Sequence, residues 1–205
     1  MQSMAMQTDW ASENLQVIRT LMERSAVYRR ALAPVMGAIG LTGLGAAGLA
    51  VVAGVKSGGA FAGYWMAVAA VCLAEAFLLV RRQALKEQEA FWSPPTRRVT
   101  QALGPSLFCG LVAGLAGLRM NSDMAWLLPA VWMVLYGCAM HSAGFFMPRG
   151  FKLFGWGFIV AGCFWMRAAT PSLIAANWAM GLFFGGAHAS YGFYLFFTEK
   201  HGNAT

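Results

Sequence analysis

The feature that most constrains this chain is an uninterrupted apolar stretch from Trp126 to Phe146, with a histidine, His141, in its second half. As a helix, this stretch would be about 30 Å long, which matches the hydrocarbon thickness of a bilayer. A histidine at that depth is costly in lipid unless the protein offers its ring nitrogens a partner. Gly137 and Gly144 share its helical face, so we expect a second helix to approach closely and His141 to point into a bundle.

Composition supports a membrane protein. Of the 205 residues, 59% are hydrophobic and only 11% are charged, whereas a soluble domain carries about 25% charged residues. The net charge of +7 does not indicate nucleic-acid binding, because the cations lie between the apolar runs and form no separate basic face. The chain is therefore expected to span a bilayer.

Six apolar runs follow the N-terminal segment, and short polar or Gly- and Pro-rich segments separate them. The predicted fold is an all-α integral membrane protein with six transmembrane helices arranged as three hairpins. Its expected transmembrane domain covers 31–198, with a cytoplasmic loop at 81–100 and a cytoplasmic tail at 199–205. The runs lie at 32–55, 61–80, 101–118, 124–146, 153–168 and 172–197.

The distribution of Lys and Arg predicts the orientation. Twelve cations fall on one side of the six runs, namely Arg19, Arg24, Arg29, Arg30, Arg81, Arg82, Lys86, Arg97, Arg98, Arg149, Lys152 and Lys200. Only Lys56, Arg119 and Arg167 fall on the other. The positive-inside rule then places both termini in the cytoplasm of a bacterial inner membrane. The first thirty residues contain charges throughout, so we expect no removable signal peptide.

Two segments outside the runs are candidates for interaction. Residues 12–30, within a cytoplasmic segment 1–30, are predicted to form a basic amphipathic helix in the headgroup layer; a dimerisation or partner-binding helix is the alternative. In loop 81–100, the first half can extend the second helix, and Pro94 and Pro95 then end it and lead into the third. A protein partner or a homo-oligomer contact is therefore expected through 12–30 or 81–100.

The cysteines do not suggest a disulfide framework. Each lies alone in a separate apolar run, and the chain has no CxxC or CxxCH motif, which argues against a zinc knuckle or covalent haem attachment. The four are Cys72, Cys109, Cys138 and Cys163.

The three hairpins resemble one another and predict a threefold internal repeat. Small residues at four-residue steps predict close helix contacts, at Ala33 and Gly37, Gly110 and Gly114, and Gly181 and Gly185. On each returning helix, an ionisable residue follows a tryptophan by nine or ten positions: Trp65 and Glu75, Trp132 and His141, Trp178 and His188. Glu75, His141 and His188 would then form one layer, roughly 5 to 8 Å past the midpoint toward the cytoplasm.

This layer has several interpretations. The three groups can hold the helices in register by hydrogen bonds, or line a site that binds or passes a small solute or ion, with Glu75 and a histidine relaying protons. They can also bind a metal ion, with Cys72 or Cys138 as a further ligand. Finally, the two histidines can hold a haem between their helices.

We favour a non-enzymatic membrane component that uses the layer for a solute or ion and needs no cofactor. A haem- or metal-binding redox subunit and a structural or regulatory subunit of a membrane complex are the alternatives. Glu75 would leave the layer if it extended toward Arg81 and Arg82. Nucleophilic catalysis has little support, because Ser142 and Ser190 lie near the histidines without a GxSxG motif.

Three segments carry a resemblance to a family. They are ENLQVIRTLMERSAVYRRALAP from Glu13 to Pro34, and later LLPAVWMVLYG and PRGFKLFGWGF. With them, the chain resembles a family of bacterial polytopic inner-membrane proteins that has no assigned activity. The resemblance implies a six-helix inner-membrane protein and assigns no site residue. Vitamin-transport S components have a similar length and helix number, which is an analogy of size alone.

Overall fold

The computed structural model describes residues 31–119, 122–147, 149–168 and 171–202, and these residues form helices and no β-strand. This confirms the all-helical class. The predicted helix at 12–30 and the last residues of the tail lie outside the described residues. The helices are Ala31–Val52, α2 (Gly58–Lys86), α3 (Pro94–Gly117), α4 (Ser122–Ala125), α5 (Leu128–Ala143), α6 (Arg149–Ala168), α7 (Leu173–Met180), the π-helix η1 (Gly181–Ala187) and α8 (His188–Gly202).

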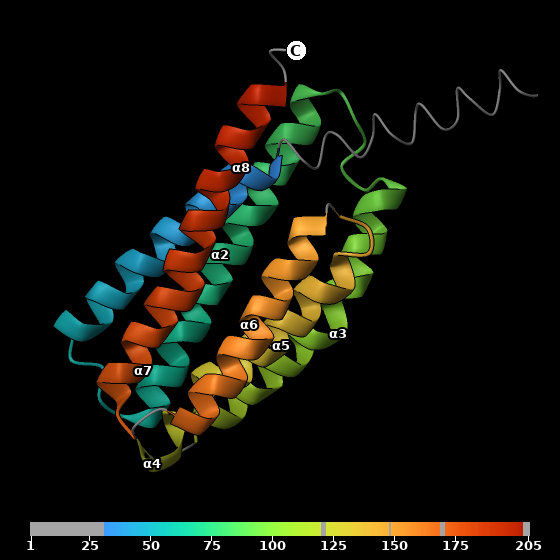
Figure 1. Ribbon diagram of the computed structural model, residues 1–205. Helices are drawn as coiled ribbons and strands as arrows, with labels where there is room; N and C mark the ends of the chain where they lie inside the picture. Colours follow the sequence, from blue (N-terminus) through green and yellow to red (C-terminus); the bar gives the residue numbers. More distant parts are fainter. Residues whose placement is uncertain (1–30, 120–121, 148, 169–170, 203–205) are drawn as a thin grey trace, which may run out of the picture.

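The helices lie side by side and alternate in direction (Figure 1). The start of the Ala31–Val52 helix, the connection between α2 and α3, and the end of α8 lie at one end of the bundle. The connection at 53–57, α4 and α7 lie at the opposite end. In the interior of the bundle, α5 packs against both α3 and α6.

Three helices are long and apolar enough to cross a membrane, judged by length and composition: Ala31–Val52, α2 and α3. The bundle is also apolar on its outside, where large side chains such as Leu41, Phe108 and Val160 are 61 to 72% exposed. Many of its buried positions are instead small alanines. Exposed hydrophobic area on this scale is typical of a surface that contacts lipid.

The structure corrects the continuous helix expected from Trp126 to Phe146. α4 ends at Ala125, a turn follows, and α5 runs from Leu128 to Ala143, which is about 24 Å by helical rise. Pro129 lies in the first turn of α5, where its missing N–H removes no helical hydrogen bond. The proline therefore marks a helix start inside a stretch whose hydropathy shows no break.

Small residues bring the first and last helices into backbone contact, as the spacing of Gly181 and Gly185 predicted. A Cβ built on Gly185 would lie 2.5 Å from the backbone nitrogen of Leu44, and one on Gly192 would lie 2.7 Å from that of Gly37. Real Cβ atoms do not approach so closely. We call this contact the first–last seam.

A second close contact joins α5 and α6. A Cβ built on Gly137 would lie 2.6 Å from the carbonyl oxygen of Gly155, and one on Gly155 would lie 2.7 Å from the backbone nitrogen of His141. The predicted approach of a helix to the Gly137 face is therefore confirmed, and the partner is α6. We call this contact the α5–α6 seam.

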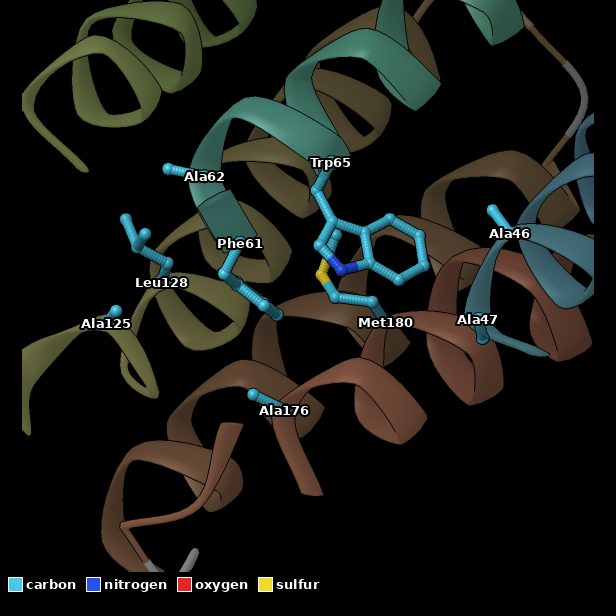
Figure 2. Close-up of a cluster of buried hydrophobic side chains, with 9 residues drawn as sticks. All are labelled: Ala46, Ala47, Phe61, Ala62, Trp65, Ala125, Leu128, Ala176 and Met180. Carbon is cyan, nitrogen blue, oxygen red and sulfur yellow. The ribbon is translucent and has the colours of Figure 1, made fainter. Parts of the chain in front are cut away.

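Two buried apolar clusters close the ends of the bundle. One, shown in Figure 2, gathers Trp65, Phe61 and Met180 with Leu128 and five alanines, namely Ala46, Ala47, Ala62, Ala125 and Ala176. Within it, the indole nitrogen of Trp65 donates a 2.8 Å hydrogen bond to the side-chain oxygen of Asn177. The other cluster comprises Leu32, Ala33, Met36, Met140, Ala143, Phe151 and Leu195.

Candidate functional site

His188 begins α8 and is almost fully enclosed, with 1% of its surface exposed. The segment before it, η1, is π-helical, a form that is rare and is found frequently at functional sites. Gly181 and Gly185 in η1 contact the first helix closely. The first–last seam and the widened turn therefore place the imidazole inside the bundle.

Aromatic rings surround His188. Its ring centroid lies 5.0 Å from that of Phe154 and 5.5 Å from that of Phe158, both on α6. Phe184 stacks on it at 6.4 Å, and Tyr136 of α5 lies at 5.3 Å. This aromatic cage shields the imidazole from lipid on several sides.

One nitrogen of His188 has a partner and the other has none. Nε2 lies 2.6 Å from the hydroxyl oxygen of Tyr136. Nδ1 is buried without a hydrogen bond of good geometry, although the backbone of Phe183 and Phe184 is close enough for a weaker one. An unpaired buried nitrogen costs free energy. In the tautomer in which Nε2 donates to Tyr136, Nδ1 is the nitrogen that can accept a proton.

Glu75 lies on α2 and faces the first helix. Its Oε1 accepts a 2.8 Å hydrogen bond from the hydroxyl of Thr42. Its Oε2 is buried without a hydrogen-bond partner. Glu75 is therefore held toward the bundle by Thr42, and the expected alternative of an extension toward Arg81 and Arg82 is not the conformation observed.

Cys72 connects the surroundings of these two groups. It precedes Glu75 by three residues on α2 and so shares its helical face, and its thiol is near enough to the Tyr136 hydroxyl of α5 for a through-space electrostatic interaction, without a hydrogen bond. Tyr136 in turn contacts His188. We call Glu75, Cys72, Tyr136 and His188 the polar chain. All four side chains can exchange a proton. They lie on α2, α5 and α8, and the direct hydrogen bond among them joins Tyr136 and His188.

His141 lies apart from the polar chain. Its ring contacts Phe145 at 5.6 Å and Trp156 at 5.7 Å, and these two side chains are 66% and 52% exposed. On α6, Trp156 points roughly opposite to Phe154 and Phe158, which contact His188, because two residues turn a helix by about 200°. The two imidazoles thus contact opposite faces of α6.

The metal and haem interpretations gain no geometric support. The described residues include His141, His188, Glu75, Cys138 and Cys72, and no three His, Cys, Asp or Glu side chains among those described are placed to hold a metal ion. Because α6 lies between the two imidazoles, there is also no gap between them for a haem macrocycle. The structure places Glu75 against Thr42 of the first helix, His188 against Tyr136 of α5 and His141 against Trp156 of α6, so the three predicted residues have separate partners.

Sequence reasoning missed Tyr136 and Thr42. Neither carries a charge at neutral pH, and a tyrosine within LLPAVWMVLYG resembles an ordinary core aromatic. The available signal for Tyr136 was its position in the middle of an apolar run, where its hydroxyl needs a partner. Asn177, which is 1% exposed and accepts a hydrogen bond from Trp65, is a third polar residue that hydropathy does not single out.

Comparisons with known proteins add no identity. No protein family matches the chain, and neither a curated protein nor a solved structure is significantly similar to it.

Proposed function

We propose that the chain is a non-enzymatic, transporter-like membrane protein that binds or passes a small solute or ion at the polar chain, and that the ion is a proton. The observation that carries the proposal is that each end of the polar chain holds a buried atom without a hydrogen-bond partner, Oε2 of Glu75 and Nδ1 of His188. Nδ1 of His141 is unpartnered as well, but its ring lies outside the polar chain. Both groups change charge when they gain or lose a proton.

The membrane placement has its own support. Three helices are apolar and long enough to span a bilayer, and large hydrophobic side chains cover the outside of the bundle. The full proposal is six spanning helices in three hairpins with both termini in the cytoplasm. We also propose that the chain lies in a bacterial inner membrane, that it is related to the bacterial inner-membrane family it resembles, and that it contacts a partner or a second copy through 12–30 or 81–100. The excess of Lys and Arg on one side favours this orientation.

A proton fits the polar chain better than a metal ion does. An alkali or divalent cation needs about six oxygen ligands, whereas Glu75 has a single hydroxyl, that of Thr42, bonded to it. Glutamate, thiol, phenol and imidazole can each give up and accept a proton. Intramembrane carboxylates and histidines commonly serve as proton relays.

Proton flux into liposomes tests the proposal. The purified protein is reconstituted into liposomes that enclose the pH-sensitive dye pyranine, and a potassium diffusion potential drives protons inward. We expect the wild type to acidify the lumen, and Glu75→Gln and His188→Gln to slow the flux at least about tenfold, since a positioned proton-transfer group contributes that much or more. Tyr136→Phe, which keeps the ring, should also slow it.

His141→Gln is the matched control and should keep the wild-type rate, because its ring lies outside the polar chain. Wild-type vesicles no more permeable than protein-free ones would exclude proton transport. Equal losses in all the variants would show that the rate follows stability and not the chain.

A structural role for the same residues is the second candidate. The hydrogen bond between Tyr136 and His188, like that between Trp65 and Asn177, joins separate helices and resembles the polar contacts that hold membrane bundles in register. In that case Tyr136→Phe lowers stability, while the liposomes show no flux in the wild type or in any variant.

A further inference from the structure

The end of the bundle where α2 meets α3 carries a group of exposed cations. We define them as the basic edge: Arg81, Arg82 and Lys86 in the last turns of α2, and Arg97 and Arg98 in the first turns of α3. Two carboxylates, Glu87 and Glu89, lie between them in the sequence, so five cations face two acids.

The connection between α2 and α3, which lies within the basic edge, is held by hydrogen bonds. The hydroxyl of Thr96, which is 7% exposed, donates to the carbonyl oxygen of Phe91 at 2.9 Å and lies 3.0 Å from the hydroxyl of Ser93. Pro94 then begins α3 with its backbone angle already suited to a helix. This connection therefore fixes the backbone at the start of α3, from which Arg97 and Arg98 project.

Exposed aromatic rings lie beside the cations. Phe77 contacts Phe91 edge to face at 5.1 Å, and Phe91 stacks on Trp92 at 6.4 Å. Trp92 is 57% exposed and Phe77 is 49% exposed. Arg81 follows Phe77 by four residues and so shares its helical face. Such an arrangement of aromatic rings with cations one turn further out is typical of the boundary between acyl chains and headgroups.

The length of α2 places this boundary at the right depth. With 29 residues, α2 is about 43 Å long, roughly 13 Å more than a hydrocarbon core. The excess is about two turns, and the last turns of α2 are the ones that carry Arg81, Arg82 and Lys86. These side chains therefore lie among the headgroups when the apolar part of α2 spans the core.

From these observations we infer that the basic edge binds the headgroup of an anionic phospholipid in the leaflet it faces. Arginine donates paired N–H groups to phosphate oxygens, and Trp92 sits at the depth of the glycerol backbone. The inference depends on the membrane placement proposed above, and it does not depend on proton transport.

Lipid-dependent stability tests the inference. The full chain is placed in nanodiscs of phosphatidylcholine alone or with one-fifth phosphatidylglycerol, and bound lipid is counted by native mass spectrometry after release in mild detergent. We expect phosphatidylglycerol to be retained and to raise the melting temperature. Arg97→Gln with Arg98→Gln should lower its retention about thirty-fold, from about five-fold per cation at an anionic surface. Lys56→Gln with Arg167→Gln, exposed cations at the opposite end, is the matched control.

Three outcomes would contradict lipid binding at the basic edge or the membrane placement on which it depends. Equal retention of phosphatidylglycerol by the two double variants would overturn the inference. Inorganic phosphate or an acidic peptide that stabilises the protein equally in phosphatidylcholine would overturn it in favour of a soluble anion or a protein partner. If the protein does not float with liposomes at all, the membrane placement fails, and that result is distinct from loss of lipid preference.

Discussion

The two histidines of the bundle occupy unlike surroundings, although they hold corresponding positions in the predicted repeat. His188 is enclosed by aromatic rings and contacts Tyr136 through Nε2. His141 is partly exposed between Phe145 and Trp156, and its buried Nδ1 has no partner. Both lie beside a close glycine contact. The difference therefore comes from α6. One face of α6 presents the aromatic rings of Phe154 and Phe158 to His188, and the opposite face presents the exposed ring of Trp156 to His141.

Replacing each histidine by alanine should give the largest contrast. His188→Ala opens a cavity among four rings and leaves the Tyr136 hydroxyl unpaired, so we expect a loss of about 3 kcal/mol in the free energy of unfolding. His141→Ala removes contacts with two exposed rings and should cost about 1 kcal/mol or less. Unfolding in mixed micelles, followed by circular dichroism, measures both. Equal losses would mean that the two sites are energetically alike.

Adding a methyl group to each seam should have the next largest effect. Gly40→Ala places a Cβ against the backbone of Ala189, and Gly155→Ala places one against that of His141. Each should lower the free energy of unfolding by about 2 kcal/mol, because two helices must separate.

Controls for the seams lie on the same helices. No atom lies within 4 Å of a Cβ built on Gly48 or Gly157, so alanine there should be neutral or stabilise by up to about 1 kcal/mol. If the controls lose as much as the seam variants, the helices are not in backbone contact at these positions. If only one of the two seam variants loses stability, the two glycine contacts differ in tightness. That difference then contributes to the contrast between the two histidines.

Removing a single hydroxyl should have the smallest effect on stability. Tyr136→Phe leaves Nε2 of His188 without its partner and should cost about 1 kcal/mol, within the range of interhelical hydrogen bonds in membranes. Tyr194→Phe, where the side chain is 60% exposed, is the control. In a His188→Gln background the cost of Tyr136→Phe should shrink, and an unchanged cost would show that the two side chains are not coupled.

Much of the fold follows from local sequence signals. The separators between apolar runs place most helix boundaries within a few residues, and α2 continues to Lys86 before α3 begins at Pro94, as the loop composition predicted. The close contacts at Gly181 and Gly185 follow from their spacing. The number of spanning helices, the orientation and the internal repeat stay predictions.

The site was harder to predict because it depends on how helices rotate against one another. Periodicity placed glycines on the face of His141, and α6 does approach that face. Periodicity cannot tell, however, which side of α6 faces His141. The π-helical turn before His188 has no signature in hydropathy, and it sets the direction of that imidazole. Tyr136 carries no charge at neutral pH, so charge does not distinguish it from the other aromatic residues of its apolar run.

The most direct test of the polar chain is infrared difference spectroscopy of the reconstituted protein during a pH titration. We expect a carboxyl band that is absent in Glu75→Gln, altered in His188→Gln and unchanged in His141→Gln. A band that survives in Glu75→Gln, or one that responds to His141→Gln and not to His188→Gln, would contradict the proposed role of the polar chain.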